Sequence, residues 1–383
     1  MNRLISKLKT AIFLALVIGS ITSCKKNDDA KPNLRASINY STLTATTVYA
    51  SAFNDASAQS TVDFTDGNNR HKMFQAINAY AGTAATTTID ANVLKNMLSN
   101  TGNPFTGTYA PLNAAGIQVR NIIASSKSAA EADAVRVKLE AEFTTLATIS
   151  QSNSVIAEKG KAGKLGTRLV DSKGMETAQI IQKSMIGSLQ LDYIANILLT
   201  KGLEADNYIV VSGKKYTQLE HNWDEAYALL TLNPIYLAGS TDAAKGTTEF
   251  ALGSYVWEYN KANYAKIYPA FLKGRAAIVN NDRAELKVQA TFIKTQLERS
   301  IAASAIGYLE KWGNRTNDAD RAHDIGEGVG FIYSLRFATV HGGDAAFSDG
   351  IITNLISSTG GFWDITPAKV AAATASIKAK FNL

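Results

Sequence analysis

The 383-residue chain has little of several residue types that define common protein classes. Its one cysteine, Cys24, lies too early to belong to a core, which excludes disulfides, thiol catalysis and cysteine metal sites. Only six prolines occur. The composition, 46% hydrophobic and 19% charged, excludes a collagen and a mostly disordered chain.

Common catalytic motifs are also absent. No Gly-x-Ser-x-Gly and no His-Glu-x-x-His sequence occurs, which removes the commonest esterase and zinc-peptidase signatures. The basic, glycine-containing segment 159–174 lacks the Walker A spacing, and the glycines of 326–330 depart from the dinucleotide-binding fingerprint. Both segments are therefore interpreted as structural.

The first 23 residues have the pattern of a targeting signal. Three basic residues precede an apolar run, Ala11–Ile21, that is too short to span a bilayer. The following sequence, Ile21-Thr22-Ser23-Cys24, resembles the lipobox of bacterial lipoproteins. We therefore expect a signal peptide over 1–23, acylation at Cys24, a polar tether over 24–39 and a folded domain over 40–383.

Charge argues against nucleic acid as a partner. Cleavage before Cys24 removes three of the 39 basic residues and none of the 33 acidic ones, so the mature chain is close to neutral. Segment 25–29 resembles the charged signals that send lipoproteins of Bacteroidetes to the outer face of the outer membrane, although a plain spacer has the same composition. The expected partner is the outer membrane, bound through the lipid, at the cell surface or on the periplasmic face.

The mature chain has the periodicity of helices. Apolar residues recur at steps of three and four over 93–98, 133–149, 185–198 and 293–309, and strand alternation is hard to find. Loops are expected at 101–111, 159–174, 232–253 and 312–320, which are rich in Gly, Asn, Asp or Thr. The pattern predicts an all-α fold, either one large helical bundle or two packed, pseudo-repeated lobes.

Two stretches combine histidine with acids. His221 precedes Asp224 and Glu225 by three and four residues, and His323 precedes Glu327 by four, so each set shares one helix face. Imidazole with carboxylate suits zinc or iron, and two helices that each offer a pair could form one site. The alternative is that each histidine is oriented by its acid within a buried polar network.

A family resemblance covers the same stretches. Segments 183–189, 216–226, 274–277 and 326–336 resemble the lipoprotein family catalogued as domain of unknown function 4856, found mostly in Bacteroidetes. The Glu220–Ala226 sequence is the most specific part, and Arg70 also matches. Because this family has no assigned activity, the resemblance implies only the extent of the domain and a cell-envelope location. Glu220 and Arg70 are further candidates for a polar core.

A remoter likeness is to the imelysin-like proteins, which are helical envelope proteins linked to iron uptake. Their Gly-x-His-x-x-Glu motif is approached by His221 and Asp224, but Leu219 stands at the glycine position and aspartate replaces glutamate. This likeness implies a duplicated helical bundle and a role in iron acquisition.

These patterns predict a binding component of nutrient uptake, with a transporter as its partner and metal or iron as the leading ligand. That function requires His221 and His323 to converge. A glycan-binding lipoprotein is the alternative, and it requires an exposed aromatic surface formed by Tyr255, Trp257, Tyr259, Tyr264 and Tyr268. A metal-dependent hydrolase with Glu225 or Glu327 as general base is the second alternative.

Overall fold

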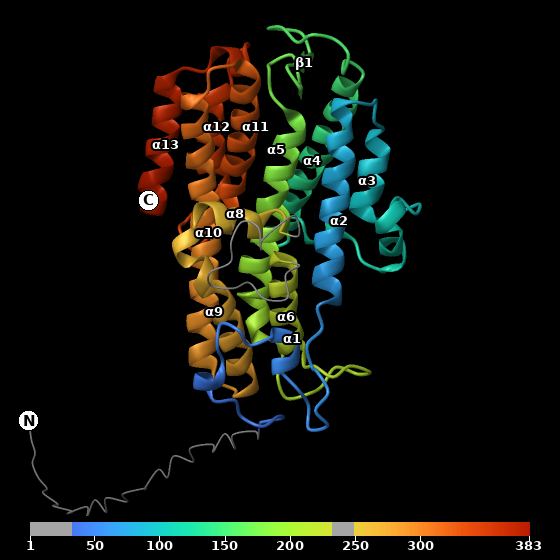
Figure 1. Ribbon diagram of the computed structural model, residues 1–383, viewed down its shortest axis with the longest axis vertical. Coiled ribbons are helices and arrows are strands. Elements are labelled where there is room, and N and C mark those ends of the chain that lie inside the picture. Colours follow the sequence, from blue (N-terminus) through green and yellow to red (C-terminus); the bar gives the residue numbers. More distant parts are fainter. Residues whose placement is uncertain (1–32, 232–248) are drawn as a thin grey trace, which may run out of the picture. The chain divides into compact units, whose positions relative to one another are not determined.

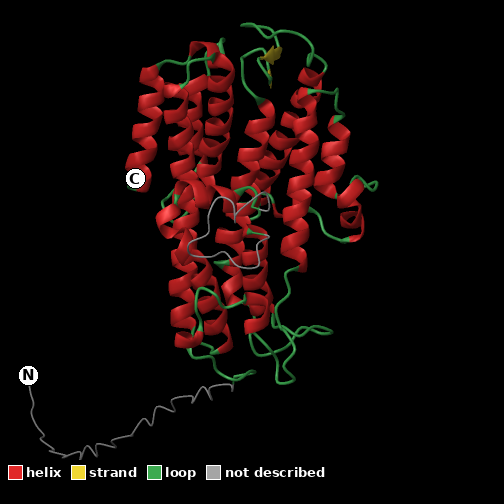
Figure 2. Ribbon diagram, in the orientation of Figure 1, coloured by secondary structure: helices red, strands yellow, loops and turns green. Residues whose placement is uncertain are grey.

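The computed structural model describes residues 33–231 and 249–383, which belong to one compact unit, Asn33–Leu383. Helices dominate this unit, as Figures 1 and 2 show, and the all-α prediction is confirmed. The two expected lobes do not separate into units of their own. None of the helices among the described residues is long and apolar enough to cross a bilayer.

The helices and strands run in the following order. They are α1 (Tyr49–Ala52), α2 (Thr65–Gly82), α3 (Ala91–Ser99), α4 (Ala129–Ser150), β1 (Gly163–Leu165), β2 (Arg168–Val170), α5 (Thr177–Met185), the π-helix η5 (Ile186–Leu198), α6 (Gln218–Leu230), α8 (Leu252–Tyr259), α9 (Lys261–Val279), α10 (Arg283–Asn314), α11 (Asp318–Ser334), α12 (Ala345–Ile356) and α13 (Pro367–Phe381). Short 3₁₀ turns lie between them at 40–42, 83–85, 107–114, 119–122, 201–204, 335–337 and 361–364.

The long helix α10 connects the two ends of the unit. It packs on α9 near one end and on α8, α11 and α13 nearer the other, while α11 packs on α5 and α2 packs on α6 (Figure 1). The core is therefore continuous along the bundle.

The folded unit begins earlier than the sequence predicted. The sequence predicts a tether that includes residues 33–39, but the backbone N–H of Ile38 donates to Asn280 Oδ1 at 2.8 Å and Asn280 Nδ2 donates back to the Ile38 carbonyl at 2.8 Å. Segment 33–39 is thus part of the fold. The predicted signal peptide and Cys24 lie outside the described residues.

Two local features differ from the predicted helices and loops. The expected loop 159–174 contains the antiparallel β1–β2 hairpin, whose three-residue strands are too short to show alternation. Helix α4 starts four residues before Asp133, because Ser128 and Glu131 form a capping box. Its predicted apolar stripe, which includes Leu139 and Phe143, is buried.

The segment 185–198 continues α5 as the π-helix η5. Its last turn shows the wider winding, since the N–H of Leu199 donates to the Ile194 carbonyl five residues back, at 2.9 Å. This helix is buried on nearly all sides, polar residues included. The predicted apolar stripe is therefore only part of its buried surface.

Polar side chains of η5 bind the ends of neighbouring elements. Gln190 Nε2 donates to the carbonyl of Leu229 at the end of α6, at 2.9 Å, and Gln190 Oε1 accepts from the N–H of Leu252 at the start of α8, at 3.0 Å. Asn196 Nδ2 donates to the Phe337 carbonyl at 3.0 Å. These bonds satisfy buried backbone groups that would otherwise destabilise the fold.

Helices α5 and α11 approach closely at glycines. A Cβ at Gly330 would lie 2.5 Å from Lys183 Cβ and 3.0 Å from the carbonyl oxygen of Ile180. The second atom belongs to the backbone, so the contact cannot be relieved by a rotamer change. Glycine at this position sets the distance between the two helices.

We expect Gly330→Ala to lower the free energy of unfolding by about 1–3 kcal/mol, because the added methyl group forces α5 and α11 apart. The matched control is Gly350→Ala on α12, where a Cβ meets nothing within 4 Å. That change should stabilise by about 0.5–1 kcal/mol. Denaturant unfolding of both variants measures the difference, and equal effects would contradict the close approach.

Candidate functional site

The predicted site residues fall into two sets at different places in the bundle. One set lies on α6 and its neighbour α2, and the other lies in the first half of α11. Figure 1 shows the start of α6 in the lower half of the bundle and the start of α11 at the upper end, near β1. His221 and His323 therefore do not converge.

The lower set is organised by a fully buried arginine, Arg275 on α9. Its Nε donates to Asp224 Oδ1 at 3.0 Å, its Nη1 to Glu220 Oε1 at 2.8 Å and its Nη2 to Thr61 Oγ1 at 3.0 Å. Three nitrogens of one guanidinium are thus satisfied by two parts of the chain, helix α6 and the segment before α2.

A second arginine completes the pairing of Glu220. Arg35 Nε and Nη2 donate to the two oxygens of Glu220 at 2.8 and 2.6 Å. Glu220 also accepts from the N–H of Thr217 at 2.8 Å, the capping box that starts α6. Burial alone would raise the pKa of Glu220, but Arg35 and Arg275 hold it below the usual value.

Asp224 is buried completely and is less well neutralised. Its Oδ1 accepts from Tyr49 Oη at 2.8 Å as well as from Arg275, while Oδ2 accepts no hydrogen bond from the described residues. Burial raises the pKa of Asp224 to about 7 against the attraction of Arg275.

Glu225 and His221 have separate partners. Glu225 pairs with Arg70 from α2. The ring of His221 stacks on Tyr216 with centroids 4.6 Å apart, and its Nε2 lies 3.9 Å from Asp66. Burial lowers the pKa of His221 despite the acids nearby.

The upper set forms a chain of charges between α5 and α11. His323 Nδ1 lies 2.7 Å from Glu176 Oε2, and His323 Nε2 lies 3.6 Å from Glu327 Oε1. Lys183, which is buried, is 2.9 Å from the same Glu327 oxygen. Burial would lower the pKa of Lys183, but Tyr255 and Glu327 raise it above the usual value.

These contacts correct the prediction of a joint metal site. Among residues 33–231 and 249–383, no three His, Cys, Asp or Glu side chains are arranged to hold a metal ion. Asp224, Glu225 and Glu327 each face a cation of the protein. The alternative interpretation, histidines oriented by acids within polar networks, describes His323 directly.

The ion pairs of Glu225 and Glu327 also affect their predicted role as general bases. Glu225 is bound to Arg70 and Glu327 to Lys183, and both carboxylates are buried. A general base must lie within hydrogen-bond reach of the proton that it abstracts, whereas each of these carboxylates faces a cation of the protein. Each candidate base is therefore held in an ion pair, and the metal-dependent hydrolase stays a prediction.

The predicted aromatic surface is also not formed. Trp257, Tyr264 and Tyr268 are 5%, 3% and 0% exposed, and Trp257 packs edge-on against Tyr264 with centroids 4.4 Å apart. Tyr255 and Tyr259 are only partly exposed. These side chains belong to the helix packing, so they offer no continuous platform to a sugar.

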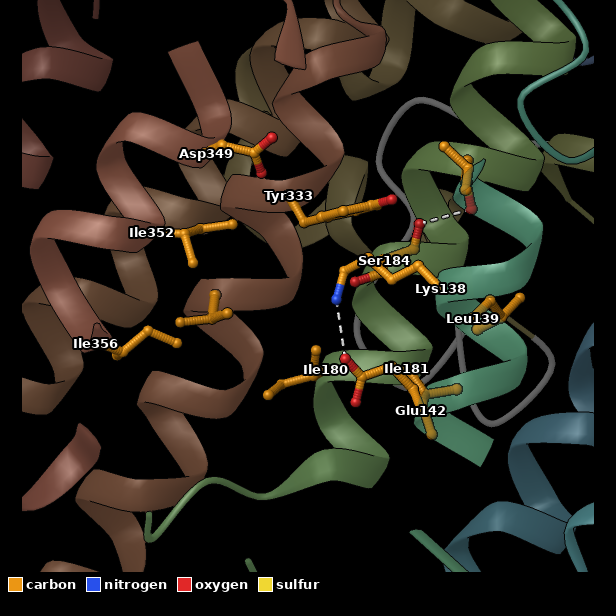
Figure 3. Close-up of a pocket in the computed structure, with 13 residues that line it drawn as sticks. Lys138, Leu139, Glu142, Ile180, Ile181, Ser184, Tyr333, Asp349, Ile352 and Ile356 are labelled. Atoms are coloured by element: carbon orange, nitrogen blue, oxygen red, sulfur yellow. Dashed lines mark hydrogen bonds and ion pairs between the residues drawn. The ribbon is translucent and has the colours of Figure 1, made fainter. Parts of the chain in front are cut away.

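A groove that sequence reasoning missed lies between four helices. Helices α11 and α12 form one wall, and α4 and α5 form the other (Figure 3). Its volume is about 200 Å³. The apolar part of the lining consists of Val135, Leu139, Ile180, Ile181, Val329, Ile352 and Ile356.

Polar groups gather at one edge of this groove. Lys138 Nζ lies 2.9 Å from Glu142 Oε1 and 5.6 Å from the centre of the Tyr333 ring. Arg336 lies against the same ring at 3.6 Å and pairs with Asp349 (Figure 3 labels Tyr333 and Asp349). The groove thus combines apolar walls with a charged and aromatic edge.

The groove is not predicted by the periodicity, because its walls come from positions with the pattern of ordinary apolar stripes. One available signal was Ser184 and Ser188, two small polar residues in an otherwise buried helix. Small side chains at spacing i, i+4 leave room on one helix face.

The comparison with family models supports one domain that covers most of the chain. The model of the family described as Domain of unknown function (DUF4856) matches residues 50–383. No curated protein and no solved structure matches the chain. The likeness to imelysin-like proteins stays a prediction.

The raised pKa of Asp224 predicts how stability depends on pH. Below about pH 7 the folded protein keeps a proton on Asp224 that the unfolded chain releases near pH 4. The contribution of Asp224 to stability therefore falls as the pH rises from about 4 to about 7 and is constant above that. Asp224→Asn should abolish this contribution.

The measurement is denaturant unfolding of both proteins between pH 4.5 and 8. Burial lowers the pKa of His71 to about 4, which gives stability that rises over the lower part of the same range. The difference between wild type and variant isolates Asp224, since His71 is common to both. Parallel curves for the two proteins would show that Asp224 is ionised in the fold.

Because His221 and His323 lie apart, we expect the protein to bind little metal. The mature chain, purified without a histidine tag, should contain far less than one equivalent of zinc or iron. The His221→Ala, His323→Ala double variant should take up the same amount from micromolar solutions. Stoichiometric metal that is lost in the variant would restore the metal prediction.

Proposed function

The chain belongs to the DUF4856 family, and we propose that it is a lipid-anchored binding component of nutrient uptake in the cell envelope, with the α4–α5–α11–α12 groove as its ligand site. The groove is the observation that carries this proposal. Its lining is largely apolar with a few polar groups at one edge, which is the composition of small-molecule sites in general.

The proposed ligand is a small organic molecule rather than a metal ion. The groove volume is about 200 Å³, and an apolar cavity of roughly 150 Å³ accommodates benzene. A compact, mainly apolar molecule therefore fits between Ile180 and Ile352. A polar substituent on this molecule would lie beside Tyr333 and the Lys138–Glu142 pair.

The groove favours reversible binding. Helices α5 and α11, one from each wall, pack closely on each other through Gly330 and through the buried Lys183–Glu327 pair, so the junction of the two walls is preformed. Lys138 and Asp349 are exposed and can move with little cost. A site with a rigid junction and a mobile edge can pass its ligand to a transporter, which is the partner we expect for uptake.

A paired substitution on α4 tests the groove. Val135 lines the groove, whereas Val137, two residues later, is 54% exposed and does not. Val135→Trp should fill the groove and weaken binding of the apolar fluorophore N-phenyl-1-naphthylamine by about tenfold or more, because overpacking excludes the ligand. Val137→Trp adds the same side chain and should leave the affinity unchanged.

The measurement is the emission of the fluorophore during titration of the chain from residue 25 onward, produced without an acyl group. Saturable binding that only Val135→Trp weakens supports the groove. Absence of saturable binding, or equal affinity of both variants, would show that the groove is not the site.

A further inference from the structure

Exposed aliphatic side chains gather where the folded unit begins. Ile209 is 71% exposed, Leu34 44% and Val210 37%. Single exposed aliphatic residues are ordinary on protein surfaces, but a group of them marks an interaction site. Leu34 and Asn207 line the same small cavity, which places Leu34 beside the loop that carries Ile209 and Val210.

The loop 205–217 holds Ile209 outward on a well-bonded base. Asp206 Oδ1 accepts from the N–H groups of Tyr208 and Ile209 at 2.8 and 2.7 Å. Asn207 is buried and donates to the carbonyl of Ile278 at 2.7 Å. The exposure of Ile209 is therefore a property of the folded loop.

Basic residues lie beside these aliphatic ones. Lys214 and Lys215 follow in the same loop and are exposed. The Lys215 carbonyl accepts from Arg35 Nη2 at 2.7 Å, which ties the loop to the first residues of the folded unit. Aliphatic side chains flanked by lysines suit the interface of a bilayer with anionic headgroups.

The position of Asn33 distinguishes the end of the bundle that carries Ile209 from the opposite end, which also has exposed aliphatic residues. Val155 and Ile156, 36% and 72% exposed, lie near Lys161 and Lys164, next to β1 at the opposite end in Figure 1. The chain enters the folded unit at the end that carries Ile209, and not at the end that carries Ile156. Nine residue steps from Cys24 to Asn33 span at most about 30 Å, so an anchor at Cys24 keeps this end near the lipid.

We propose that Leu34, Ile209, Val210, Lys214 and Lys215 form a membrane-docking surface that lies on a bilayer containing anionic lipids. The argument from the anchor rests on the proposed function, whereas the surface can be tested without it. Docking orients the domain with the loop 205–217 towards the lipid.

The test uses the chain from residue 25 onward, without an acyl group, and vesicles of phosphatidylethanolamine and phosphatidylglycerol. Ile209→Asp should lower the partition coefficient on these vesicles by about tenfold, because an isoleucine that enters the lipid interface is replaced by a charge that anionic lipid repels. Ile156→Asp is the matched control, since Ile156 is 72% exposed against 71% for Ile209. It should change the coefficient by less than about twofold.

Co-sedimentation measures binding, and added salt should weaken it through Lys214 and Lys215. No binding to anionic vesicles, equal losses in both variants, or a loss only in Ile156→Asp would each overturn the proposal. Binding of N-phenyl-1-naphthylamine to Ile209→Asp, measured in parallel, reports the groove separately. A failure of the docking surface is thereby distinguished from a failure of the proposed function.

The acylated chain offers a second measurement. Cys24 is the only cysteine, so Ile209→Cys or Ile156→Cys provides a single free thiol for a fluorophore once Cys24 carries lipid. In reconstituted vesicles, nitroxide-labelled lipid should quench a label at 209 several-fold more than one at 156. Equal quenching at both positions would contradict the orientation.

Discussion

The fold depends on the burial of one guanidinium group. Arg275 has no exposed surface, so its charge must be neutralised by acceptors held in place, and Glu220 and Asp224 on α6 supply them. Loss of Arg275 would leave the buried Asp224 without a cation and Glu220 with Arg35 alone, at a cost of about 3–5 kcal/mol. The same network extends to Arg35, so the segment that follows the predicted tether is joined to the interior of the bundle.

This constraint explains the segments that resemble the family. A Cβ at Gly274 would lie 2.0 Å from the ring of Trp223, so glycine is required for the indole to pack on α9. The next residue on each helix, Arg275 and Asp224, forms the ion pair. The Glu220–Ala226 sequence and the Gly274–Arg275 pair are thus two halves of one packing unit, and their pattern reflects structure before it reflects any ligand.

Sequence periodicity predicted the helices because a buried face repeats every three to four residues, whatever the partner is. It could not predict what the acids bind. Spacing placed His221, Asp224 and Glu225 on one helix, but Asp224 pairs with Arg275 on α9, whereas Glu225 and His221 lie against Arg70 and Asp66 on α2. The groove could not be predicted either, because it exists only between helices and periodicity does not place helices relative to one another. The turn to π-winding in η5 also has no periodic signature at this length.

The proposed groove site and the proposed docking surface together define how the domain is oriented on the membrane. In Figure 1 the groove helices α4, α5, α11 and α12 occupy the upper half of the bundle, whereas α1 and the first residues of the unit lie at the lower end. A domain docked through Ile209 therefore holds its groove away from the lipid, and the charged edge at Lys138 and Asp349 is reached from the aqueous side. A ligand that arrives through water and is mainly apolar gains most from such a site, because the groove replaces its contact with water by the walls at Ile180 and Ile352.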